Sequence, residues 1–173
     1  MTPVADVYIG LGSNLDQPRE QVSRALEALD SLPLTHCMHA SRLYASRPVG
    51  PQNQPDFINA VARLETRLSP LALLDQLQAL EQHHRRVRQY RWGPRTLDLD
   101  LLLFGEQVIE SPRLRIPHPE MCMRAFVLLP LAELTPALRL PDGRRIADLI
   151  DELAGSTGTA GMIQALPCSP KRA

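Results

Sequence analysis

The sequence predicts an α+β fold in which helices pack on one face of an antiparallel sheet. Residues 57–65 and 97–104 alternate between two sets of side chains with a period of two, which is typical of strands. Residues 22–29 and 71–80 instead repeat apolar side chains at the helix period. Together with two earlier strands, this order (strand, helix, strand, strand, helix, strand) predicts a ferredoxin-like α/β sandwich.

The first strand is expected at residues 4–11, which are largely apolar and partly β-branched. It runs into Gly10-Leu11-Gly12-Ser13-Asn14, which we interpret as a turn. Asp16 can cap the helix that follows, and Pro18 suits its first turn. An apolar stripe along this helix predicts one buried face, formed by Val22, Ala25, Leu26 and Leu29.

The second and third strands flank a loop rich in proline. Residues 35–44 are expected to form the second strand and residues 57–65 the third. Between them, residues 46–55 contain three prolines and a glycine, a density that excludes a helix or a central strand and predicts a stiff loop.

The second helix is expected to start at Ser69-Pro70, and five leucines line one side of it: Leu71, Leu73, Leu74, Leu77 and Leu80. Two shorter helices are expected at residues 124–133 and 146–153, after the fourth strand. Residues 1–153 are therefore predicted to form one domain. Residues 154–173, with several glycines and two late prolines, are predicted to be a flexible C-terminal tail.

Composition excludes some classes of partner. The 173 residues include 19 Lys and Arg and 19 Asp and Glu, so the chain carries no formal net charge. We therefore expect no general attraction to nucleic acid or to acidic membranes. Lys171 is the only lysine, and the many arginines suit bidentate contacts with phosphate, although genomic base composition explains this bias equally well.

The cysteines indicate a reducing compartment. They are odd in number, namely Cys37, Cys122 and Cys168, and have no metal-ligand spacing. The N-terminus lacks a basic region followed by an apolar run, and no apolar stretch is long enough to span a bilayer. We therefore expect a cytoplasmic protein with no membrane anchor.

A basic segment leads directly into two aspartates. No acidic residue lies between Glu81 and Asp98, and this interval holds His83, His84, Arg85, Arg86, Arg88, Arg91 and Arg95. A charge run on its own is most often a solvated face. Here, however, it precedes Asp98 and Asp100, which are separated by one residue on a strand. Their side chains therefore share a face, at a distance of roughly 7 Å along the strand.

Two carboxylates on one face repel each other unless a cation or water lies between them. Mg²⁺ suits such a pair, because it binds a few carboxylate oxygens and takes its remaining ligands from water and phosphate. Nearby arginines can hold the same phosphates, since phosphoryl transfer depends mainly on positioning and electrostatics. A bare Asp-x-Asp is weak evidence, so the hypothesis of a magnesium-dependent phosphoryl transferase rests on the whole segment.

Residues 91–100, Arg-Trp-Gly-Pro-Arg-Thr-Leu-Asp-Leu-Asp, resemble the signature of the 6-hydroxymethyl-7,8-dihydropterin pyrophosphokinase family. The resemblance extends over about the first four-fifths of the chain, through residues 8–15, 48–59, 86–88, 117–118 and 124–130. It implies a ferredoxin-like fold and a monomer with two Mg²⁺ ions. It also implies transfer of the pyrophosphoryl group of ATP to the hydroxymethyl group of a reduced pterin, with AMP released, in folate biosynthesis.

The resemblance also implies roles for individual residues. The catalytic residues would be Arg86, Arg95, Asp98 and Asp100, of which Asp98 and Asp100 bind the metal. ATP would contact Gln78, Glu81, Arg86, Arg88, Trp92, Arg95, Leu101, His118 and Arg124, with Arg86 and Arg88 on a mobile loop. The pterin would contact Ser46, Val49, Phe57, Asn59, Trp92, Asp98 and Phe126. Without the resemblance, Phe57 and Phe126 would more often be core residues, and His118 would have no assigned role.

Parts of the sequence also fit other interpretations. Gly10-x-Gly12 is not a dinucleotide fingerprint, because the third glycine is missing and no parallel βαβ unit is predicted. A magnesium-dependent nucleotidyltransferase or phosphohydrolase would use the same aspartates and arginines. An RNA-recognition domain is disfavoured, because no strand carries its paired aromatics. A homologue that keeps the fold without activity stays open.

Overall fold

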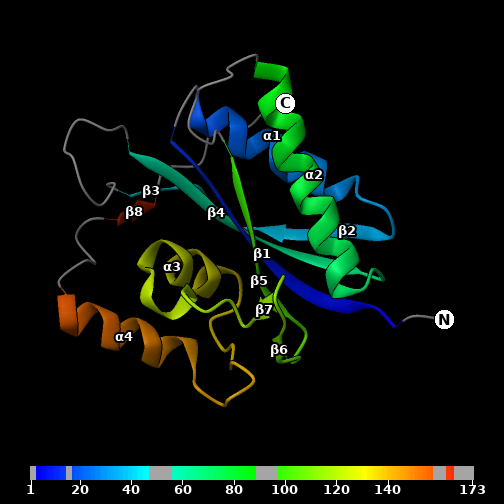
Figure 1. The fold of residues 1–173 in the computed structure, drawn as a ribbon. Helices are drawn as coiled ribbons and strands as arrows, with labels where there is room; N and C mark the ends of the chain where they lie inside the picture. Colours follow the sequence, from blue (N-terminus) through cyan, green and yellow to red (C-terminus); the bar gives the residue numbers. More distant parts are fainter. Residues whose placement is uncertain (1–2, 15–16, 47–55, 89–96, 158–162, 166–173) are drawn as a thin grey trace.

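The computed structural model describes residues 3–14, 17–46, 56–88, 97–157 and 163–165 (Figure 1). Within these residues, six strands form one antiparallel sheet in the order β5 (Asp98–Phe104), β1 (Ala5–Ser13), β4 (Phe57–Thr66), β3 (Tyr44–Ser46) and β8 (Ile163–Ala165), with β2 (Thr35–Ala40) also paired to β4. Because β1 lies between β4 and β5, the sequence prediction of a ferredoxin-like order is confirmed.

Helices cover both faces of the sheet, not one as the sequence suggested. Helices α1 (Pro18–Asp30) and α2 (Pro70–Arg88) lie on one face, and α3 (Ala125–Leu134) and α4 (Ile146–Thr157) lie on the other (Figure 1). The strands have buried apolar side chains on both faces: Ile9 and Ala62 pack with α1 and α2, whereas Val61 packs with α3. A second helical layer is needed to remove this second apolar face from water.

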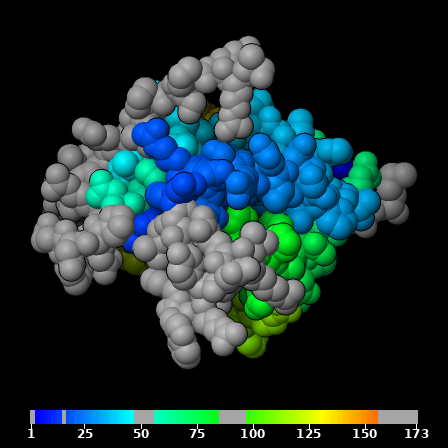
Figure 2. Space-filling model, turned by 90° about the horizontal axis from the view of Figure 1, so that it is seen from above, coloured from blue at the N-terminus to red at the C-terminus, as the bar shows by residue number. Residues whose placement is uncertain are grey.

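Helices α1 and α2 lie side by side on their face. Gln21 of α1 is buried, and its Oε1 lies 2.9 Å from Nδ1 of His84 in α2. The view from above shows α1 in blue beside the green residues of α2 (Figure 2). None of the helices in the described part of the chain has the length and apolar character needed to cross a bilayer.

Several boundaries differ from those expected in the first half of the chain. The first strand was expected to end at residue 11, but Gly12 and Ser13 continue β1, because Gly12 pairs with both β4 and β5 and Ser13 pairs with β4. The N-cap of α1 is Gln17, not Asp16. With a φ of 60°, the backbone of Gln17 has a left-handed conformation. The second strand is divided into β2 and β3, which pair with successive parts of β4.

The second half contains additional elements. Helix α2 continues to Arg88, so Arg86 and Arg88 have a helical backbone where a loop was expected. A hairpin of β6 (Ile109–Glu110) and β7 (Arg115–Ile116), and the 3-10 turn η1 (Met121–Met123), follow β5. Two ordered pieces lie within the tail expected at residues 154–173, namely the end of α4 and β8. The flexibility of this tail and the domain boundary at residue 153 stay predictions.

Strand β5 contains an irregularity that explains its run of leucines. Tyr8 pairs with Leu103 but Ile9 pairs with Leu101, so Leu102 is an extra residue in β5. Leu102 and Leu103 therefore both pack with α3 and α4. The residues before the bulge keep strict alternation, which leaves both aspartates on that same face.

The apolar layer beneath α3 makes a testable contribution to stability. Replacing the fully buried Leu128 by alanine should lower the free energy of unfolding by about 2–5 kcal/mol, because it leaves a cavity between α3 and the sheet. Denaturant unfolding measures the change. The control Leu71→Ala, at a leucine of α2 that is 45% exposed, should cost at most about 1 kcal/mol. Equal losses for the two variants would contradict this assignment of the core.

Candidate active site

The floor of the candidate site is formed by alternate residues of three neighbouring strands. In the register of the sheet, Gly10 pairs with Asp100 and Gly12 with Asp98, while Gly12 also pairs with Asn59 on the other side. Cross-strand partners point to the same face. Since the two glycines have no side chains, the centre of the floor is open between the carboxylates of β5 and the amide of β4.

A cavity of about 490 Å³ occupies this opening. Its roof is the start of α3 and the residues just before it, which cross over the sheet. Its lining consists of Gly10, Leu11, Gly12, Ser46, Phe57, Asn59, Ala60, Asp98, Asp100, Met123, Arg124, Phe126 and Val127. Two aromatic rings, from β4 and from α3, thus face one cavity that has carboxylates at one end and an amide at the other.

A second cavity of about 360 Å³ lies against the outer edge of β5. It is lined by Leu74, Gln78 and Glu81 of α2, by Leu99, Asp100 and Leu101 of β5, and by Ser111, Pro112, Arg113, Leu114, Arg115, His118 and Pro119. Asp100 lines both cavities. Its carboxylate therefore lies where groups bound in the two cavities would meet.

The surroundings of Asp100 make its ionised form costly. Burial raises the pKa of Asp100 above its ordinary value of 3.8. The negative charges of Asp98 and Glu120 act in the same direction, whereas His118 and Arg124 lower this pKa. A cation bound between the carboxylates would relieve this repulsion.

Hydrogen-bonding groups from α2 and from the segment after the hairpin bind the backbone of β5. The carboxylate of Glu81 accepts a hydrogen bond of 2.8 Å from the backbone N–H of Leu99, the residue between the two aspartates. The backbone N–H of His118 donates to the carbonyl of Leu102 at 2.9 Å. Nδ1 of His118 accepts from the backbone N–H of Glu120 at 3.2 Å, so Nε2 is the ring nitrogen left to contact a ligand.

At the other end of the larger cavity, Asn59 and Ser46 are both buried and bonded to each other. Nδ2 of Asn59 donates to Oγ of Ser46 at 2.8 Å. Oδ1 of Asn59 lies close to Gly12, because a Cβ added there would be only 3.1 Å from it. The position of this amide therefore depends on the absence of a side chain at residue 12.

Arg124 provides a cation at the mouth of the larger cavity. Its Nη2 forms an ion pair with Oε2 of Glu120 at 2.6 Å, and its Cζ lies 5.5 Å from the centre of the Phe126 ring. The guanidinium is therefore held beside the carboxylates by an acidic partner and an aromatic face.

The structure brings most of the predicted site residues together. The larger cavity gathers Ser46, Phe57, Asn59, Asp98, Asp100, Arg124 and Phe126, and the smaller one gathers Gln78, Glu81, Asp100, Leu101 and His118. Val49, Trp92 and Arg95 lie outside the described residues. Arg86 and Arg88 lie on the last turns of α2, of which only the backbone is described.

Other residues at the site were missed by the sequence analysis. Arg113 and Arg115 line the smaller cavity from the hairpin, and Arg113 donates to Asp75 at 2.6 Å and to Gln78 at 3.2 Å. The resemblance implied that Gly10 and Gly12 lie in a turn whose backbone is near the pterin site, whereas the structure places them in β1, on the cavity floor. Their spacing of two residues, within an otherwise apolar strand, was the signal that could have identified them.

Comparison with known proteins identifies similar chains. Residues 8–136 match the family model described as 7,8-dihydro-6-hydroxymethylpterin-pyrophosphokinase (HPPK). The chain is 59% identical over 144 residues to the 2-amino-4-hydroxy-6-hydroxymethyldihydropteridine pyrophosphokinase of Pseudomonas aeruginosa, covering 83% of this chain and 89% of that one. It is 52% identical over 147 residues to the enzyme of the same name from Haemophilus influenzae, covering 85% and 92%.

Solved structures share the fold. The crystal structure of Plasmodium falciparum HPPK-DHPS wild type with pterin and p-hydroxybenzoate superposes with a TM-score of 0.75 at 14% identity. The match covers 95% of this chain but 47% of the solved chain, so the chain spans about half the length of that protein.

The glycine floor leads to a prediction with a matched control. Gly12→Ala should lower the free energy of unfolding by about 1–3 kcal/mol, because its Cβ crowds Oδ1 of Asn59 and strains the bond to Ser46. Gly10→Ala should stay within about 1 kcal/mol of the parent, since its Cβ would lie 3.5 Å from Leu102, an ordinary contact. Denaturant unfolding compares the two, and equal stability of both variants would show that Gly12 is not crowded.

Proposed function

This chain belongs to the 7,8-dihydro-6-hydroxymethylpterin-pyrophosphokinase family, and we propose that its two joined cavities hold the two substrates of that enzyme. The enzyme transfers the pyrophosphoryl group of ATP to the hydroxymethyl group of 6-hydroxymethyl-7,8-dihydropterin in folate biosynthesis. AMP and the pterin diphosphate are the products. The observation that carries the assignment of the site is that Asp100 lines both cavities.

The larger cavity suits a flat heterocycle. Phe57 and Phe126 offer aromatic surface from opposite walls, and the paired glycines leave room between them. Asn59 and Ser46 supply polar groups for the rim of the ring, at the end opposite the aspartates. A pterin placed in this way would direct its hydroxymethyl group toward Asp98 and Asp100.

The smaller cavity suits ATP. Gln78 and Glu81 line it from α2, and Arg113, Arg115 and His118 line the opposite side. The triphosphate would extend toward Asp100, where Arg124 adds positive charge. By position in the family, Arg86, Arg88 and Arg95 would also contact the phosphates, and Val49 and Trp92 would complete the two binding sites.

The residues present fit the Mg²⁺ that such a reaction uses. Asp98 and Asp100 lie on one face of β5, and no cluster of three or more His, Cys, Asp or Glu side chains suited to a metal occurs among the described residues. Mg²⁺ accepts such an incomplete protein site, because water and phosphate oxygens complete its six ligands. When bound, it would neutralise charge on the transferring phosphates. We propose two ions, held by these two aspartates.

The residues of the site then act mainly by positioning. The hydroxymethyl oxygen forms a bond to the β-phosphorus of ATP and loses its proton to solvent, and the bond from that phosphorus to the α,β-bridging oxygen breaks, so AMP leaves. His118, whose Nδ1 is taken by the backbone N–H of Glu120 so that Nε2 is left to donate, and Arg124 can donate hydrogen bonds to phosphate oxygens as charge develops. A monomeric state and a cytoplasmic location stay predictions.

The products distinguish this reaction from those of a nucleotidyltransferase or a phosphohydrolase. Incubation with ATP, Mg²⁺ and 6-hydroxymethyl-7,8-dihydropterin should yield AMP and the pterin diphosphate in equal amounts, measured by chromatography and ³¹P NMR. Omission of the pterin is the control and should leave ATP intact. Release of free phosphate, or of pyrophosphate with a nucleotide transferred to the pterin, would contradict the assignment.

The carboxylates are tested by replacing both. Asp98→Asn with Asp100→Asn should lower turnover by on the order of 10³-fold or more, because the charge that holds the metal against the triphosphate is lost. The unfolding midpoint should not fall, since the substitution removes the repulsion between two half-buried carboxylates. Asp142→Asn, at an exposed turn far along the chain, is the control and should keep full activity. Unchanged turnover in the double variant would refute the metal assignment.

A further inference from the structure

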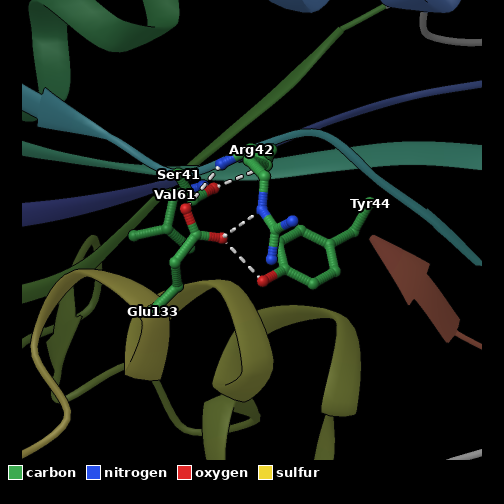
Figure 3. A network of polar contacts seen from close by, with 5 residues as sticks. All are labelled: Ser41, Arg42, Tyr44, Val61 and Glu133. Carbon is green, nitrogen blue, oxygen red and sulfur yellow. Dashed lines mark hydrogen bonds and ion pairs between the residues drawn. The ribbon is translucent and has the colours of Figure 1, made fainter. Parts of the chain in front are cut away.

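A polar network joins the end of α3 to the connection between β2 and β3 (Figure 3). Its centre is the carboxylate of Glu133, whose Oε2 accepts the backbone N–H of Arg42 at 3.0 Å. Oε1 accepts the hydroxyl of Tyr44 at 2.7 Å and lies 3.6 Å from Nε of Arg42. One carboxylate thus holds a backbone group, a phenol and a guanidinium.

Ser41 fastens the same connection to the sheet. Its Oγ accepts the backbone N–H of Val61 at 2.9 Å and donates to the carbonyl of Arg42 at 2.8 Å. Its backbone N–H donates to the carbonyl of Val61 at 2.8 Å. Through Ser41, Glu133 is therefore tied to the middle of β4, as the dashed lines in Figure 3 show.

Helix α3 is otherwise entirely apolar. The sequence of α3 is AFVLLPLAEL, so Glu133 is its only residue with a polar side chain. The other side chains of α3 pack by apolar contact, which is not directional and allows a helix to shift along or about its axis. The hydrogen bonds of this carboxylate are the directional side-chain contacts that α3 makes with Arg42 and Tyr44.

The placement of the charge also indicates a role outside the helix. A carboxylate in the last turn opposes the helix dipole, which favours cations there. Burial, and then the hydrogen bond and charge of Glu133, raise the pKa of Tyr44 from 10 to about 12, which favours the protonated phenol that donates to Glu133. The contacts of Glu133 with Arg42 and Tyr44 thus offset the unfavourable interaction of its negative charge with the helix dipole.

Both partners joined by Glu133 carry walls of the larger cavity. Helix α3 contributes Phe126 and Val127 at its start, two turns before Glu133. On the other side, Tyr44 lies on β3 two residues before Ser46, which is bonded to Asn59. A shift of α3 relative to β3 would change the width of the cavity between Phe126 and the polar side chains of Ser46 and Asn59.

We propose that Glu133 is a positioning residue for the pterin site: by binding Arg42 and Tyr44 it sets the distance between α3 and β3, and with it the fit of the pterin ring. This proposal rests on the proposed function of the larger cavity. The smaller cavity is lined by α2, β5, the hairpin and the segment after it, and by no residue of α3 or β3. The effect of Glu133 should therefore be selective for the pterin.

The test measures the two substrates separately. For Glu133→Ala, the dissociation constant of the pterin should rise about tenfold, titrated by fluorescence with a non-hydrolysable ATP analogue and Mg²⁺ at saturation. The affinity for the ATP analogue, and kcat at saturating pterin, should stay within about twofold. Tyr44→Phe should raise the pterin constant about threefold. Glu133→Gln should retain most of the parent affinity, because its amide oxygen can accept the N–H of Arg42 while its amide N–H donates to the hydroxyl oxygen of Tyr44.

A stability control separates positioning from loss of fold. Thr35→Val removes a buried hydrogen bond at the far end of β4, in which Oγ1 of Thr35 lies 2.7 Å from Oγ1 of Thr66. It should lower the thermal midpoint in a manner comparable to Tyr44→Phe and leave the pterin affinity unchanged. In a double-mutant cycle, the effects of Tyr44→Phe and Glu133→Ala on pterin binding should be less than additive.

Three results would overturn the proposal. One is an unchanged pterin constant in both Glu133→Ala and Tyr44→Phe, and another is an equal loss of affinity for both substrates. If Glu133→Ala does not fold, Tyr44→Phe alone decides, since it removes a single hydroxyl. Finally, a parent protein that binds no pterin would refute the proposed function together with this inference, whereas the first two results leave the proposed function intact.

Discussion

The register of the central strand β1 between β4 and β5 is the constraint on which the site depends. Because side chains alternate with a period of two, this register places Gly10, Gly12, Asn59 and the two aspartates on one face. A slip of one residue would turn the carboxylates into the apolar layer beneath α1 and α2. The buried apolar residues of both faces hold the register in place, so the core and the site are specified by the same pairing.

The bulge at Leu102 reconciles two demands on β5. Its first half must present carboxylates to the cavities, and its second half must bury four consecutive apolar residues, Leu101 to Phe104. One extra residue allows both apolar layers to be filled while Asp98 and Asp100 keep their face. The half-buried carboxylate of Asp100 opposes stability in the absence of a cation, which is typical of a functional site held by the surrounding fold.

Helix α3 binds the sheet both by apolar packing and by the directional hydrogen bonds of Glu133. Helix α3 supplies apolar side chains to the core and, at its start, one wall of the larger cavity. Apolar packing sets how strongly α3 binds the sheet, whereas the contacts of Glu133 set where it binds. Stability and cavity shape are thus carried by different residues of the same helix.

The sequence by itself determined the elements and the chemistry, because both are local: the periods of β4, β5, α1 and α2 follow from neighbouring residues, as does the run of arginines leading to Asp98 and Asp100. It also placed Phe57 and Asn59 on one face. Only the tertiary structure decided that helices cover both faces, that Gly12 and Ser13 belong to the first strand, and that Asp100 joins two cavities. These features depend on contacts between residues far apart in the chain, such as Arg42 with Glu133, and no local period encodes them.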